Sequence, residues 1–339
     1  MPFQPLSSTD FLSVLNETRS IWSAGLKPDE YCHYNYMQQR EPWGRKHQEL
    51  WGYRSDNGEI AASLKLYRLS LMSRHQTFPC YGVGAIYSMQ KYRGQGFGAK
   101  IVEAMIEKAQ DDKQAAVLLF SDIGTAFYEQ FGFYEMGTIE FSLPVEGAGI
   151  DAKKLSGAHY KVTPLIEADL ELMERHHRRW LAQRPFGVCR SLDYFRYKVH
   201  KEDYLNRHSR LPWPKLHTIM VGDGLDLAYV IYEISSENLR VLELVTSQAL
   251  VENIWRAVFA EAVKHGVKKI KSWESNVLEL APSFSLKSFF ASTVYKTDFV
   301  PTIYYSQRSW GKVMILPLEN EVLPWLRTFP SPILELDHL

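Results

Sequence analysis

This chain of 339 residues has few cysteines, no long apolar run and a formal net charge of zero. The three cysteines, Cys32, Cys80 and Cys189, include no Cys-x-x-Cys pair, which argues against a disulfide framework or a thiolate metal site and fits a reducing compartment. No stretch approaches the roughly 18 apolar residues of a membrane span. Lys plus Arg and Asp plus Glu both total 39, so charge does not direct the chain toward nucleic acid or an anionic membrane.

The sequence opens without the basic and apolar regions of a signal peptide, and we therefore expect a cytoplasmic protein. Hydrophobic residues make up 45% of the chain, which predicts a folded core in one large domain or two ordinary ones.

Hydrophobic periodicity and turn residues predict an α/β fold in the first half, with a mixed, twisted sheet flanked by helices. Ser8 or Thr9 is expected to cap the first helix, and Asn57-Gly58 is typical of a tight hairpin turn. The expected helices lie near residues 8–22, 27–37, 99–110 and 125–130, and the expected strands near 49–54, 59–69, 81–89 and 115–120.

The second half repeats the order hairpin, strand, helix, strand, at residues 218–221, 226–234, 240–245, 251–266 and 267–273. We interpret it as a degenerate second copy of the first α/β unit, because the loop after Val245 contains no glycine. The predicted domains are residues 1–148 and 149–339, with a linker over 144–149.

A glycine-rich loop carries the strongest chemical signal. Arg93-Gly94-Gln95-Gly96-Phe97-Gly98 lies between an expected strand and an amphipathic helix. Phosphates bind where such a turn exposes backbone N–H groups at a helix N-terminus, and Arg93 adds a cation there. An ordinary glycine turn is the simpler reading of the hexapeptide alone.

A dinucleotide fingerprint is a rival reading, with Gly94, Gly96 and Ala99 as its small residues and Asp122 as the ribose-binding acid. That fingerprint belongs to the first strand of a parallel sheet, whereas this loop follows two helices and an antiparallel hairpin. The context therefore argues against it.

About thirty residues later comes Phe127-Tyr128-Glu129-Gln130-Phe131-Gly132-Phe133. Together the two motifs resemble the GCN5-related N-acetyltransferase (GNAT) superfamily, which pairs an Arg/Gln-x-x-Gly-x-Gly/Ala loop with a Phe/Leu-Tyr-x-x-x-Gly-Phe segment. The resemblance covers residues 8–144 and implies direct transfer of an acetyl group from acetyl-CoA to an amine, without a metal.

The resemblance assigns Tyr128 as the group that protonates the departing thiolate, although a packed core tyrosine is the alternative. The cofactor-binding residues that it implies are Ile86, Tyr87 and Ser88 at the end of a splayed strand, Arg93, Gly94, Gln95, Gly96, Phe97 and Gly98 in the pyrophosphate loop, and Ser121 and Phe127 beyond it. Ser121 stands where the family often has asparagine, which puts that side-chain contact in doubt.

Three shorter segments resemble fungal L-lysine N6-acetyltransferases that carry a C-terminal extension: Ile21-Trp22, residues 26–31 and residues 119–124. This implies a small-molecule amine as partner, with free L-lysine or a related amino acid as the best candidate. Eis-type enzymes, which modify aminoglycosides and protein lysines, and a non-catalytic acetyl-CoA-binding module are the alternatives. The general base stays open between a carboxylate acting through water and a terminal carboxylate of Leu339, as in Eis-type enzymes.

Other polar and aromatic clusters carry weaker signals. His176-His177 is expected on a solvated helix surface, since adjacent residues do not share a helix face for a metal. The aromatic run 31–36 and Trp43 are compatible with a substrate pocket or with core packing. Asp29, Glu30 and Glu41 are compatible with attraction of an amine or with a solvated surface.

Overall fold

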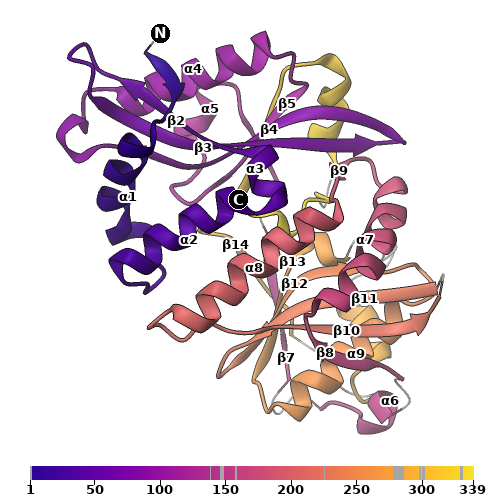
Figure 1. Ribbon diagram of the computed structural model, residues 1–339. Coiled ribbons are helices and arrows are strands. Elements are labelled where there is room, and N and C mark those ends of the chain that lie inside the picture. Colours follow the sequence, from indigo (N-terminus) through magenta and orange to yellow (C-terminus); the bar gives the residue numbers. More distant parts are fainter. Residues whose placement is uncertain are drawn as a thin grey trace.

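The computed structural model describes residues 2–137, 139–145, 149–156, 159–224, 226–277, 286–297, 299, 302–328 and 331–339. Its described part forms two mixed sheets with helices on their faces, arranged as an upper and a lower layer in Figure 1. This confirms the predicted α/β class. The longer helices are α1 (Ser8–Trp22), α2 (Pro28–Arg40), α4 (Phe97–Asp111), α7 (Glu167–Ala182), α8 (Leu192–His208) and α9 (Val251–Lys264), and the shorter ones are α3 (Pro42–His47), α5 (Ala126–Glu129), α6 (Ala152–Ser156) and α10 (Leu286–Thr293).

The first sheet has the strand order β1-β2-β3-β4-β5-β15-β6, with the short β9 paired to β3. Only β4 and β5 run parallel among these described strands. The strands are β1 (Phe3–Pro5), β2 (Gln48–Arg54), β3 (Ile60–Ser73), β4 (Gln76–Ser88), β5 (Ala116–Ser121), β6 (Tyr134–Met136), β9 (Gly187–Val188) and β15 (Lys312–Pro317).

The second sheet has the order β14-β7-β13-β12-β11-β10-β8. Its hairpin β10–β11, strand β12, helix α9 and parallel strand β13 repeat the order found around α4, as the sequence predicts. The strands are β7 (Ile139–Pro144), β8 (Lys161–Pro164), β10 (Leu216–Asp223), β11 (Asp226–Ile234), β12 (Asn238–Val245), β13 (Lys269–Trp273) and β14 (Tyr304–Gln307).

The two sheets exchange strands across the predicted boundary at residue 148. β7 precedes that boundary, yet it pairs with β13 and β14. β15 follows it, yet it lies between β5 and β6. The division at residue 148 therefore describes the order of elements along the chain and not the division between the sheets, and linker residues 146–148 lie outside the described residues.

Helix α8 is shared by both layers. Tyr194 and Tyr197 pack into the core beneath the first sheet, whereas Phe195 packs into the core of the second. The C-terminal segment 331–339 also lies between the two layers, and Figure 1 places the C-terminus in the middle of the molecule. There Arg190 forms buried ion pairs with Glu243 of β12 and with Asp337, 2.8 Å away, which fixes the end of the chain between the layers.

Two local expectations are wrong. The first helix is capped by Ser7, whose hydroxyl accepts from the Asp10 amide at 3.2 Å while the Asp10 carboxylate accepts from the Ser7 amide. This capping box moves the cap one residue ahead of Ser8. His176 and His177 are buried rather than solvated, because α7 packs between β11 and α8.

Candidate active site

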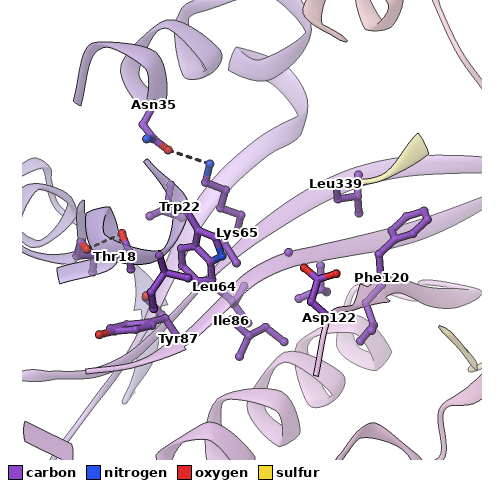
Figure 2. Close-up of a pocket in the computed structure, with 18 of the residues that line it drawn as sticks. Thr18, Trp22, Asn35, Leu64, Lys65, Ile86, Tyr87, Phe120, Asp122 and Leu339 are labelled. Atoms are coloured by element: carbon purple, nitrogen blue, oxygen red, sulfur yellow. Dashed lines mark hydrogen bonds between the residues drawn. The ribbon is translucent and has the colours of Figure 1, made fainter. Parts of the chain in front are cut away.

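A cavity of about 690 Å³ opens where β4 parts from β5 (Figure 2). Parallel pairing between these strands runs from Cys80 to Val83 and stops there among the described pairs. Beyond it, β4 stays paired with β3 through a bulge, and Ala85 takes a positive φ of 50°. The β5-facing edge of residues 84–88 is thereby left open to the cavity.

Three of the predicted cofactor residues, Ile86, Tyr87 and Ser88, line this open edge. Arg93 also lines the cavity, and its guanidinium lies 5.3 Å above the Tyr87 ring and donates to the Tyr87 hydroxyl at 3.0 Å. The bulge thus brings the predicted strand end and the predicted cation to one wall.

The glycine loop follows directly, at the N-terminus of α4. Gly94 and Gly96 have φ values of 75° and 81°, and a Cβ at either would meet nothing within 4 Å. Among the described residues the amides of Gly94, Gly96, Phe97 and Gly98 make no hydrogen bond, whereas those of Ala99 and Lys100 donate to the Gly96 carbonyl at 3.1 Å. Several free N–H groups therefore meet at the positive end of the helix dipole, as an anion requires.

The rest of the loop supports this cradle. A Cβ at Gly98 would come within 3.2 Å of the Ser88 hydroxyl, so Gly98 keeps the loop close to the strand. The Gln95 side-chain amide donates to the Lys91 carbonyl at 3.1 Å, and Phe97 packs edge-on against Tyr92. The loop residues from Gly94 to Gly98 lie outside the cavity lining proper.

Tyr128 lines the cavity from α5. Its ring packs against Phe127 and Phe133, with centroids 5.0 and 5.9 Å away, while its hydroxyl makes no hydrogen bond to the described residues. Burial and the charge of Asp122 raise the pKa of Tyr128 to about 12. The phenol therefore keeps its proton at neutral pH and has no competing acceptor among the residues that the structure describes.

Ser121 is buried and outside the lining, and its hydroxyl donates to the Gly124 carbonyl and accepts from the Ile123 amide at 3.3 Å. These bonds hold the turn that leads to α5, so the cofactor contact of Ser121 stays a prediction. The next residue, Asp122, reaches the cavity, where it is the one Asp or Glu among the described lining residues.

Sequence reasoning missed the cationic end of the cavity, which holds Lys65 of β3 and Lys201 of α8. The Lys65 ammonium donates to Asn35 Oδ1 of α2 at 2.9 Å (Figure 2). Burial and the charge of Lys201 lower the pKa of Lys65 to about 7, and burial lowers the pKa of Lys201. A lysine between two buried leucines of an apolar strand was the signal for Lys65, whereas nothing local marks Lys201.

Aromatic rings and the chain end close this end of the cavity. Tyr31 and Tyr34 line it, as the pocket reading of the aromatic run allowed, but Asp29, Glu30 and Glu41 do not. Leu339 packs against β4 so closely that a Cβ at Gly82 would lie 2.6 Å from its side chain.

The corresponding gap in the second sheet is filled. β12 pairs with β13 only as far as Val241 among the described pairs. Asn276 lies there, accepting from the Leu244 amide at 2.9 Å and donating to the Val241 carbonyl at 3.3 Å. The Asn276 side chain thus bonds to the backbone of β12 at the place where the corresponding edge of β4 stays open.

Within the described ranges, no three His, Cys, Asp or Glu side chains are grouped as metal ligands would be. No helix of the described chain is long and apolar enough to cross a membrane.

Residues 15–137 match the family described as Acetyltransferase (GNAT) domain. That segment contains the open edge of β4, the glycine loop and Tyr128. It is similar to a GNAT acetyltransferase domain. No curated protein matches the chain significantly.

Solved structures share the fold of nearly the whole chain, not only that of residues 15–137. A probable N-acyltransferase of unknown function from Enterococcus faecalis is 12% identical with a TM-score of 0.67, covering 95% of this chain and 74% of its own. A GCN5-related N-acetyltransferase from Anabaena variabilis is 12% identical with a TM-score of 0.64, covering 92% and 71%. Eis1 from Mycobacterium abscessus is 14% identical with a TM-score of 0.57, covering 94% and 74%.

Proposed function

We propose that this protein transfers the acetyl group of acetyl-CoA directly to the amine of a small molecule, with a free amino acid such as L-lysine as the best candidate. One observation carries the proposal: the open edge of β4, Arg93 and Tyr128 line a single cavity, and the unbonded amides before α4 follow directly after Arg93. Together they provide an anion cradle, a strand edge and a proton donor.

In this proposal the amides of the glycine loop and the Arg93 guanidinium hold the pyrophosphate, and the β4 edge aligns the pantetheine arm. The amine nitrogen attacks the thioester carbonyl, and the bond from carbon to sulfur breaks as the intermediate collapses. Tyr128 gives its proton to the departing thiolate. Holding both substrates in line supplies much of the rate enhancement, and no covalent acetyl-enzyme is needed.

The amine must lose a proton before it attacks, since a lysine ε-amine has a pKa near ~10.4. Asp122 is our candidate for accepting that proton through water, because it is the carboxylate of the described lining. Leu339 lies in the same cavity, so a terminal carboxylate remains the second candidate.

The test is a CoA-release assay with free amino acids, polyamines, aminoglycosides and lysine-containing peptides as acceptors. Release that depends on an added amine, with the N-acetyl product identified by mass, is the expected result. Tight binding of acetyl-CoA without release on any acceptor would instead identify a non-catalytic binding module.

A further inference from the structure

Two ammonium groups face the cavity from opposite halves of the chain without a carboxylate partner. Lys65 is held by the neutral amide of Asn35, and Lys201 lies with its ammonium 5.7 Å from the centre of the Tyr197 ring. Within the described residues, neither lysine forms an ion pair. Glu202 adjoins Lys201, but its carboxylate accepts from the Trp213 indole at 2.8 Å.

In the protein without a ligand this arrangement destabilises the folded state, because buried like charges repel each other and lose their hydration. A third lysine lies nearby: Lys198 donates to the His338 carbonyl at 2.5 Å, and burial and the charge of Lys201 hold the pKa of Lys198 well below its usual value. An anion bound between these lysines would offset this destabilisation.

The position of the lysines separates that anion from the pyrophosphate. Lys65 is paired with Gly84, where β4 leaves β5, whereas Ser88 and the glycine loop lie at the far end of the open edge. The lysine end is also walled by Tyr31 and Tyr34 of α2, so it lies on the side where an acceptor has room.

We infer that Lys65 and Lys201 together bind a carboxylate of the acceptor, which is therefore an amine that carries a carboxylate group. The inference rests on the proposed acetyl transfer and assigns the residues that select its substrate. Asn35 is a positioning residue, since its amide oxygen holds the Lys65 ammonium while its amide nitrogen donates to the Tyr31 carbonyl at 2.9 Å. The same two charges repel polycationic acceptors such as aminoglycosides.

The experiment compares acceptors that differ only in the carboxylate: L-lysine, L-lysinamide and cadaverine, and other free amino acids with their carboxamides. Wild-type kcat/KM should favour the acid over its amide on the order of 10–100-fold, the range of a charge-assisted contact. Lys201→Gln should lower that ratio at least roughly tenfold, mainly through KM of the acid. Lys201→Arg should retain the preference, and Lys201→Glu should reverse it toward cadaverine.

Lys46→Gln is the matched control, because Lys46 is exposed on α3, far from the cavity lining, and should leave the ratio unchanged. Equal use of acids and amides by the wild type, or an unchanged ratio in Lys201→Gln with normal acetyl-CoA binding, would overturn the inference while acetyl transfer stands. If Lys201→Gln instead lowers the use of succinyl-CoA relative to acetyl-CoA, the lysines serve the donor and the inference is wrong.

Absence of turnover with every amine would refute the proposed function, and calorimetry then decides the subsite by itself. Binding of L-lysine to the wild type that is lost in Lys201→Gln would support a carboxylate site. Failure of every free amino acid to bind the wild type would overturn it.

Discussion

At the scale of single residues, Tyr128 joins two properties that are usually separate. Its ring is packed between Phe127 and Phe133, as in a core tyrosine, yet the residue lines the cavity and its hydroxyl is unbonded within the described structure. The packing fixes the direction of the phenol, and the raised pKa keeps its proton available. The two readings of Tyr128 therefore differ only in what the hydroxyl does.

Tyr128→Phe should lower turnover on the order of 10²–10⁴-fold, because it deletes the proton donor and keeps the ring. Acetyl-CoA affinity should change little, since the proton is needed only as the intermediate collapses. Steady-state rates and calorimetry measure the two effects, and Tyr134→Phe, at an exposed tyrosine of β6, is the control. Wild-type turnover in Tyr128→Phe, with chemistry shown to limit the rate, would remove Tyr128 from the mechanism.

His177 carries a prediction on stability. Burial, together with the nearby Arg190 charge, holds its pKa well below 6.5, so the folded protein keeps it neutral. Below pH 6.5 this histidine binds a proton in the unfolded chain but not in the folded chain. The free energy of unfolding therefore falls by up to ~1.4 kcal/mol per pH unit for this group. That stability is present above pH 6.5 and is lost as the pH falls.

The measurement is the pH dependence of the free energy of unfolding between pH 7 and 5. His177→Phe, which can pack against Trp180 and Phe195, should make the slope shallower by about one proton. The same change at the exposed His159 should leave the slope as it is. Parallel slopes in wild type and His177→Phe would mean that His177 is charged in the fold.

At the scale of elements, mutation can distinguish the loop before α4 from an ordinary glycine turn. Gly96→Asp should weaken acetyl-CoA binding roughly tenfold or more, because it places a negative charge where the phosphates are expected and strains a φ of 81°. Gly58→Asp imposes the same strain at a φ of 82° in the β2–β3 turn, equally free of neighbours, and should leave binding intact. Calorimetry that finds similar affinities for the two variants would refute the phosphate site.

The sequence predicted these elements well where the signal is local. Apolar residues at helical spacing gave α4 and α9, and the glycine loop and Tyr128 motif indicated the site. Lys201 and the placement of β15 could not be predicted, because both depend on contacts between distant segments. The run from Val313 to Leu316 is apolar, but nothing in it specifies β5 and β6 as neighbours.

At the scale of the whole molecule, the two units resemble each other in topology and differ in their gaps. The second gap is closed by Asn276, and the loop after Val245 lacks glycine. We therefore expect a titration to saturate at one acetyl-CoA per chain. A second equivalent that disappears on mutation around Thr246–Ala249 would contradict this prediction. Because Lys201 of α8 lines the cavity, we propose that the second half shapes the substrate site instead.

The exchange of β7 and β15 between the sheets has a consequence for synthesis on the ribosome. The chain emerges from its N-terminus, so β5 and β6 are made long before the strand that separates them, and the edge of β5 waits without a partner until residue 317 has left the tunnel. Unpaired strand edges are prone to association with other chains. The first sheet therefore cannot be completed as it is made, and nascent chains stalled before β15 should depend on a chaperone to stay soluble.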